Sequence, residues 1–180
     1  QPGLAGHVIL QWDDKFGSSA NNYDLFLYDE SEREIARSVN HQDGDGDPME
    51  WVRFVNSGDE AKEFTVRVVQ AAADDALLKI YVLPLSGRSV KLDPCTSSGS
   101  LFGQQAVKQA LVVGAAAQGK NLTVREYSSR GPVLIRYPAY ELRKKPDLVA
   151  PDHVTILTSS MHPAVFTGTS ASAPHIAGLA

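Results

Sequence analysis

The chain has 180 residues, of which 43% are hydrophobic and 21% charged, and its formal net charge at pH 7 is −4. This ordinary globular composition excludes a disordered tail, a collagen-like fibre and a disulfide-dense miniprotein. No apolar run reaches the roughly 18 residues of a membrane-spanning helix, and no signal-peptide pattern is visible, so no membrane partner is expected. The slightly acidic balance argues against a nucleic-acid partner. Cys95 is the single cysteine, which excludes an internal disulfide and a cysteine-based metal site.

Charge divides the chain into two parts. Residues 1–94 contain 17 acidic and 9 basic side chains, a net charge of −8. Residues 95–180 contain 4 acidic and 8 basic side chains, a net charge of +4. A break of this size predicts two domains of different origin, 1–94 and 95–180.

Six segments of the first part alternate between apolar and polar residues or are rich in β-branched and aromatic ones, which predicts strands. Clusters of Gly, Asp and Ser between the segments favour turns. In chain order the predicted strands are 7–12, 22–29, 34–39, 50–56, 63–70 and 76–83. Residues 1–94 are therefore predicted to form a small antiparallel β-sandwich.

Two features of this part carry alternative functional interpretations. Its aromatic side chains could form a platform for a carbohydrate, but core and cross-strand packing is favoured for such residues in strands. Asp43, Asp45 and Asp47 could bind calcium, but Pro48 and the position of Glu50 depart from the EF-hand pattern. A solvated turn is favoured there, so no cofactor is expected, with calcium as the alternative.

In the second part, the short apolar run 110–114 predicts a buried strand. The sequence from Gly114 to Asn121 nearly matches the phosphate-binding loop G-x-x-x-x-G-K-[ST]. However, Asn121 replaces the hydroxyl residue that would bind magnesium, and 122–127 resembles a strand instead of the helix that such a loop needs. A tight turn between two strands is therefore favoured over nucleotide binding.

The end of the chain carries the most specific chemical signal. Gly168 permits a sharp turn, and residues 171–180 are compatible with a helix that has Pro174 near its first turn. Ser170 is therefore predicted at a helix N-terminus, where free N–H groups and the helix dipole favour negative charge. This position suits an attacking oxygen and the oxyanion that it generates, with a plain helix cap as the competing interpretation.

Four spaced segments resemble the subtilisin-like serine proteases and follow the order of that family. They are 111–115, 127–132, 145–151 and 168–178, the last of which reads GTSASAPHIAG. The resemblance covers about residues 95–180 and implies that this part belongs to an α/β catalytic domain. It also implies that Ser170 is the nucleophile, which attacks a peptide carbonyl to form an acyl-enzyme, and that the Ser170 N–H is an oxyanion donor.

The rest of the family's catalytic machinery is not found in this sequence. The Asp motif D-[ST]-G, the His motif H-G-[TS] and the Gly-Asn segment of the side-chain oxyanion donor are all missing. His175 lies five residues after Ser170, about 140° around a helix, so the two side chains diverge. We interpret His175 as a packed residue without a catalytic role, and the other four histidines as surface or turn residues.

We therefore expect a piece of a larger, secreted serine endopeptidase that ends just after the nucleophile helix begins and is inactive alone. Residues 1–94 are expected to be a β-sandwich inserted in the catalytic domain, similar to modules found beside secreted bacterial peptidases. Peptide or protein substrates are the expected partners, and exposed apolar surface on residues 95–180 predicts association with another copy. In the alternative interpretation, the β-sandwich binds substrate, a carbohydrate or a partner, and the protease half is vestigial.

Overall fold

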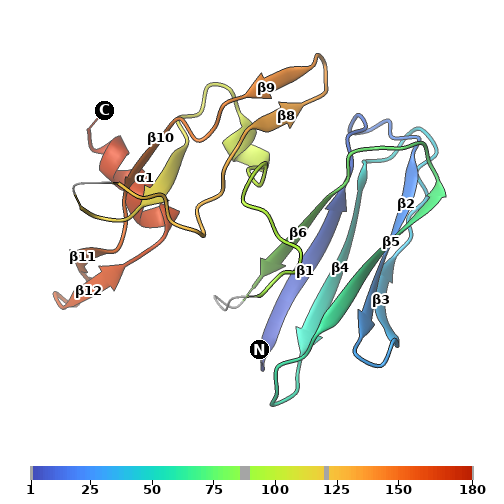
Figure 1. The fold of residues 1–180 in the computed structure, drawn as a ribbon, viewed down its shortest axis with the longest axis horizontal. Coiled ribbons are helices and arrows are strands. Elements are labelled where there is room, and N and C mark those ends of the chain that lie inside the picture. Colours follow the sequence, from blue (N-terminus) through green and yellow to red (C-terminus); the bar gives the residue numbers. More distant parts are fainter. Residues whose placement is uncertain (1, 86–89, 120–121, 180) are drawn as a thin grey trace. The chain divides into compact units, whose positions relative to one another are not determined.

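The computed structural model describes residues 2–85, 90–119 and 122–179, and the chain divides into two compact units, 1–93 and 94–180. The described parts of both units consist mainly of strands in small sheets, together with one α-helix of nine residues (Figure 1). The β-rich character predicted from the sequence is confirmed. Among the described residues, no helix is long and apolar enough to cross a membrane.

Unit 1, residues 1–93, has two antiparallel sheets of three strands in its described part, ordered β4-β1-β6 and β3-β2-β5. The strands are β1 Leu4–Gln11, β2 Asn22–Asp29, β3 Glu34–Ser38, β4 Met49–Asn56, β5 Phe64–Ala72 and β6 Lys79–Pro84. Each lies where the sequence pattern predicted it, with ends shifted by no more than three residues.

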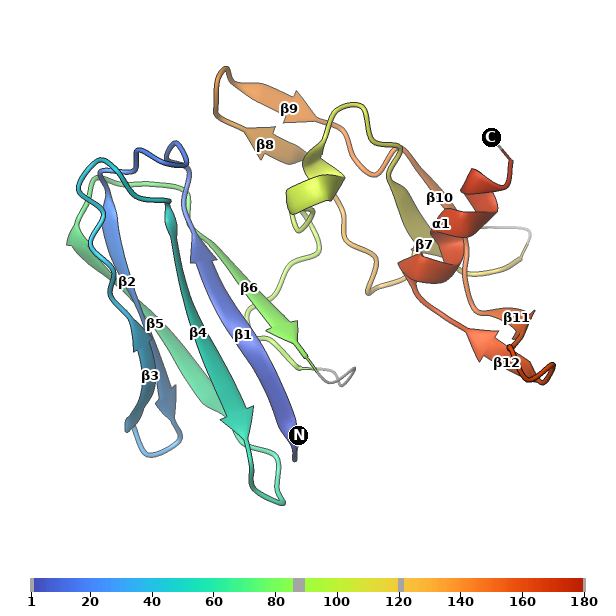
Figure 2. The ribbon, with the colours of Figure 1, turned by 180° about the vertical axis from the view of Figure 1, so that it is seen from behind.

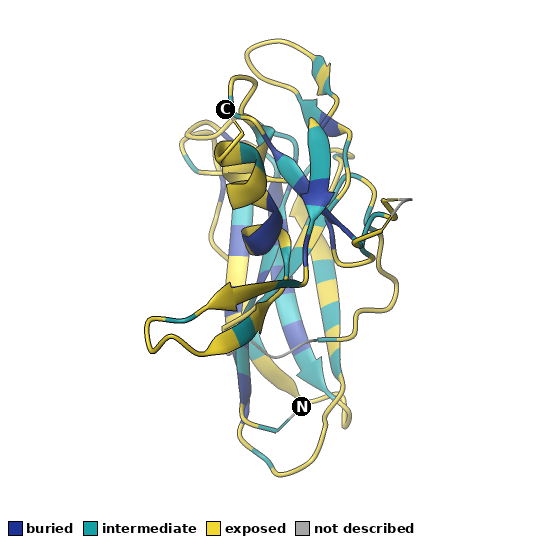
Figure 3. Ribbon diagram, turned by 90° about the vertical axis from the view of Figure 1, so that its left-hand side faces the viewer, coloured by how far each residue is buried: buried dark blue, intermediate teal, exposed yellow. Residues whose placement is uncertain are grey.

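The two sheets of unit 1 share one hydrophobic core. Buried residues alternate with more exposed ones along β1, β2 and β4 (Figure 3), and Leu10 and Leu25 have no exposed surface. Burying such a side chain contributes roughly 1.5–3 kcal/mol to the free energy of unfolding. Trp12, Tyr23 and Phe54 belong to the same core, so core packing is confirmed as their role.

Unit 2, residues 94–180, is built from shorter strands that form two-stranded sheets. The parallel sheet joins β7 Val113–Ala116 to β10 Leu148–Pro151, and α1 Thr169–Ala177 packs against both strands (Figure 2). The remaining elements are the 3₁₀ helix η1 Gly103–Ala106, the antiparallel pair β8 Val133–Ile135 and β9 Glu141–Arg143, and the antiparallel pair β11 Val154–Leu157 and β12 Pro163–Phe166.

The predicted strand 122–127 does not form. Val124 alone makes a bridge, to Ala116 at the end of β7. Directly afterwards the chain turns, since the Ser128 N–H donates a hydrogen bond to the Arg125 carbonyl oxygen at 3.0 Å. The turn carries the backbone away from β7, so the pairing stops after a single bridge.

Candidate active site

The segment 168–178 contains helix α1 and its N-terminal cap. Gly168 is the N-cap residue, with φ 101° and ψ 173°, a conformation that favours glycine. The Gly168 carbonyl oxygen accepts the first helical hydrogen bonds, from the N–H groups of Ala171 at 2.9 Å and Ser172 at 3.4 Å. The helix starts two residues earlier than predicted, at Thr169, so Ser170 lies in its first turn and does not cap it.

Ser170 is exposed, and its hydroxyl has no hydrogen-bond partner among the described residues. The backbone N–H groups of Thr169 and Ser170 also have no acceptor among the residues that the structure describes. The first N–H groups of a helix have no partner within the helix, and they carry the positive end of the helix dipole. Ser170 therefore combines a free hydroxyl with a local field that stabilises an oxyanion.

The His175 side chain makes no hydrogen bond to Ser170. Its Nδ1 lies 2.8 Å from the carbonyl oxygen of Ala171, one turn earlier in α1. The residue is exposed, so the prediction that it is packed is wrong. The reason is that this hydrogen bond holds the imidazole against the outside of its own helix.

The other two histidines of unit 2, His153 and His162, also make no side-chain hydrogen bond to Ser170 among the described residues. Both of them and His41 of unit 1 are exposed and lie outside regular structure, which confirms their interpretation as surface or turn residues. His7 differs, because it is half-buried on β1 with its ring centroid 5.2 Å from that of Trp51 in an edge-on arrangement.

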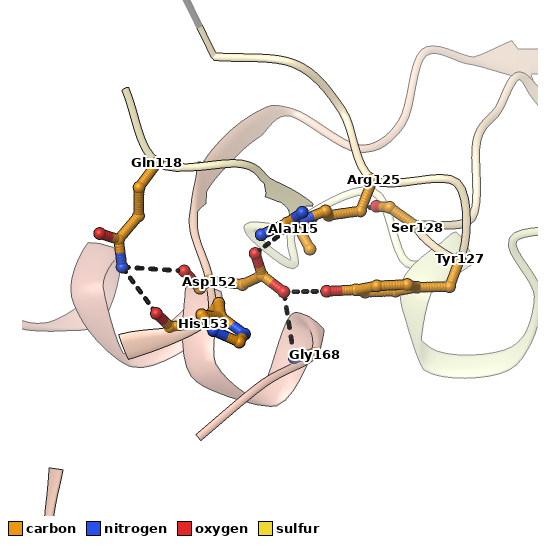
Figure 4. Close-up of polar contacts among 8 residues, drawn as sticks. All are labelled: Ala115, Gln118, Arg125, Tyr127, Ser128, Asp152, His153 and Gly168. Carbon is orange, nitrogen blue, oxygen red and sulfur yellow. Dashed lines mark hydrogen bonds and ion pairs between the residues drawn. The ribbon is translucent and has the colours of Figure 1, made fainter. Parts of the chain in front are cut away.

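A buried carboxylate lies beside the start of α1. Asp152 follows β10 directly and has no exposed surface. Its Oδ1 accepts a hydrogen bond from Arg125 Nε at 2.7 Å, and its Oδ2 accepts hydrogen bonds from the Tyr127 hydroxyl and from the Gly168 N–H, the latter at 3.3 Å (Figure 4). Sequence reasoning missed this cluster. The available signal was an acidic residue just after a strand of a parallel sheet, where functional side chains often gather.

The pKa of Asp152 is lowered from its ordinary value of 3.8. Burial is the largest single influence and acts in the opposite direction, but the hydrogen bonds from Arg125 and the Gly168 N–H, together with the Arg125 charge, outweigh it. Asp152 is therefore ionised at neutral pH. The Arg125 guanidinium balances this negative charge next to the helix.

Two other segments that resemble the family, 127–132 and 145–151, are joined by a backbone hydrogen bond. The Gly131 N–H donates a hydrogen bond to the Lys145 carbonyl oxygen at 2.9 Å, and a Cβ on Gly131 would lie only 2.3 Å from that oxygen. The buried Lys145 Nζ in turn donates to the Asp147 carboxylate at 2.8 Å and to the Ala110 carbonyl oxygen at 2.7 Å. Asp147 accepts the Val112 N–H at 2.7 Å, which connects both segments to the residues just before β7.

Among the described residues, no group of three or more His, Cys, Asp or Glu side chains could hold a metal ion. In the loop considered for calcium, Asp47 Oδ1 accepts a hydrogen bond from the Gly17 N–H at 2.8 Å.

The phosphate-loop and tight-turn interpretations depend on Lys120 and Asn121. These two residues lie outside the described residues. The described residues 122–132 that follow form no helix, so the helix N-terminus that a phosphate loop needs is not formed there.

A sequence model of the subtilase family, peptidase S8, matches residues 21–180. The chain belongs to the subtilase family. The resemblance drawn from the four segments is thereby confirmed, and the matched range of this subtilase includes β2 to β6 as well as unit 2. Comparisons with curated proteins and with solved structures gave no match.

Proposed function

We propose that this subtilase chain is part of a secreted serine endopeptidase in which Ser170 is the nucleophile. The observation that carries the proposal is the exposed, unpartnered hydroxyl of Ser170 in the first turn of α1. Ser170 Oγ attacks the carbonyl carbon of the scissile peptide and loses its proton to a general base. The base passes that proton to the departing amine, which leaves an acyl-enzyme that water hydrolyses. The free Ser170 N–H donates to the oxyanion.

In this proposal, the general base, the carboxylate that orients it and the side-chain oxyanion donor come from residues outside these 180. Two observations support this: the family's Asp and His motifs do not occur in the sequence, and no histidine of unit 2 hydrogen-bonds to Ser170 among the described residues. The 180-residue chain alone is then inactive, because the members of a catalytic triad act as a unit and loss of the base removes most of its effect.

Unit 1 is, in the same proposal, a β-sandwich module inserted into the catalytic domain. Its support is a separate core, formed by two sheets of residues 1–93, together with the change in net charge at the boundary of the units. A module with its own core can be inserted at a loop without disturbing the packing of its host.

The test is covalent labelling of the full-length protein with a fluorophosphonate probe, followed by mapping of the adduct by mass spectrometry. We expect an adduct on Ser170 and a loss of peptide hydrolysis on the order of 10⁶-fold in Ser170→Ala. The matched control is Ser159→Ala, which removes another exposed hydroxyl and is expected to change neither readout.

An unlabelled Ser170 in the native, mature protein would contradict the proposal. Hydrolysis that is unchanged in Ser170→Ala would contradict it as well. Either result would favour the alternative in which the protease half is vestigial and unit 1 binds a ligand.

A further inference from the structure

We propose that Asp152 is a positioning residue for the nucleophile: its carboxylate holds the backbone of Gly168 and thereby the first turn of α1, which carries Ser170. The inference rests on the proposed role of Ser170. Gly168 lies two positions before Ser170, and the side chain that binds its N–H comes from Asp152, just after β10 (Figure 4).

The mechanical link runs through Gly168. A glycine backbone has more conformational freedom than any other residue, and at φ 101° no Cβ restrains it. Its N–H is held by Asp152 Oδ2 at 3.3 Å, and its carbonyl oxygen is held by the Ala171 N–H at 2.9 Å. Without the carboxylate, the Gly168 N–H has no acceptor, and only the helical hydrogen bonds to its carbonyl oxygen hold the residue. The helix start, and Ser170 with it, would then lose its hydrogen bond to the residue that follows β10.

Asp152 is itself firmly held. Its N–H donates to the Ala116 carbonyl oxygen at 3.0 Å, and its carbonyl oxygen accepts a hydrogen bond from the Gln118 side-chain amide at 3.1 Å. Arg125 and Tyr127 bind the carboxylate from the side (Figure 4). A group held at both its backbone and its side chain can transmit the position of the β7–β10 sheet to α1.

Arg125 makes a carboxylate compatible with this position. A bare negative charge near Ser170 would oppose the oxyanion that forms during catalysis. The ion pair between Arg125 Nε and Asp152 Oδ1, at 2.7 Å, balances the charge while Oδ2 still binds Gly168. Asp152 can therefore accept the Gly168 N–H and orient the helix start, while the Arg125–Asp152 pair carries little net charge.

The experiment compares Asp152→Ala, Asp152→Asn and Tyr127→Phe in the full-length protein. The readouts are the rate of fluorophosphonate labelling at Ser170, and kcat and KM for peptide hydrolysis. For Asp152→Ala we expect labelling and kcat to fall about 10- to 100-fold with KM nearly unchanged, because a small misplacement of a reacting group is this costly.

Asp152→Asn should recover part of the loss, since its amide oxygen can still accept the Gly168 N–H. Tyr127→Phe keeps the Gly168 bond and should stay within about threefold of the wild type.

Three results would overturn the inference: wild-type kcat in Asp152→Ala, a change confined to KM, or an Asn variant as impaired as the Ala variant. If Asp152→Ala does not fold, Asp152→Asn decides. A loss of about 3- to 30-fold supports the inference and a wild-type rate overturns it. Failure of the proposed function gives a different result, because Ser170 of the wild-type protein is then unlabelled and both proposals fall together.

Discussion

At the scale of single residues, the scaffold depends strongly on Gly131. The three atoms nearest to a Cβ at this position all belong to the backbone of Lys145, the closest at 2.3 Å. Backbone atoms cannot move aside as the end of a flexible side chain can. The Gly131–Lys145 contact therefore allows no side chain at all, although Gly131 does not need a left-handed conformation.

We predict that Gly131→Ala lowers the free energy of unfolding of unit 2 by about 3 kcal/mol or more, because the added methyl group forces two backbone segments apart. The measurement is chemical denaturation followed by circular dichroism. Gly178→Ala serves as the control, since its Cβ would lie 3.4 Å from the Pro174 carbonyl oxygen and φ is −80°. Equal stability of the two variants would show that the close approach at Gly131 is not a constraint.

At the scale of elements, Asp147 connects the segment before β10 to the segment before β7. Its pKa is lowered from the ordinary value of 3.8, first by the hydrogen bond from Lys145 and then by the one from the Val112 N–H. A depressed pKa in the folded state means that the unfolded chain binds the proton more readily. The resulting stabilisation is complete above pH 3.8 and is lost as the pH falls through the lower folded value.

We therefore predict that unit 2 loses stability as the pH falls below about 4, and that Asp147→Asn shows a smaller loss over the same range. Denaturation curves between pH 2.5 and 7 provide the comparison. Asp152 also has a lowered pKa, so the variant should keep part of the acid dependence. An acid dependence identical to that of the wild type would rule out the stabilising contribution assigned to Asp147.

Local sequence patterns were sufficient for some of these elements and insufficient for others. The strands of unit 1 were predictable because one face of each central strand is buried, which imposes a period of two. The segment 122–127 has strand-forming residues, but the turn at Ser128 ends its pairing, and no local pattern contains that information. Ser170 was found because its motif is contiguous. Asp152 was missed because its partners Arg125 and Tyr127 lie 27 and 25 residues earlier in the chain.

At the scale of the whole molecule, unit 2 exposes much of its apolar surface. On the β11–β12 hairpin, Leu157 is 62% exposed and Val165 is 58% exposed, and the strand register places them on the same face. Exposed apolar side chains beside open strand edges favour association. The structure thus provides a physical basis for the proposal that copies of this chain associate.

We predict that the isolated 180-residue chain self-associates with rising concentration in sedimentation velocity. The double variant Leu157→Lys/Val165→Lys should remain closer to the 19.4 kDa monomer. The matched control, Val39→Lys/Leu77→Lys, changes two exposed apolar residues of unit 1 and should associate as the wild type does. A wild-type chain that sediments as a 19.4 kDa species at every concentration would contradict the prediction.

The contact between Gly131 and Lys145 has one more consequence, because it closes the base of the β8–β9 hairpin. Beyond that closure the tip is exposed, with the Arg136 guanidinium 5.7 Å from the centre of the Tyr140 ring. A loop closed at its base can grow at little cost, about 0.6 kcal/mol for each doubling of its length. The tip of the hairpin is therefore a natural place for length variation in evolution, and a suitable place to insert an affinity tag while the base below stays intact.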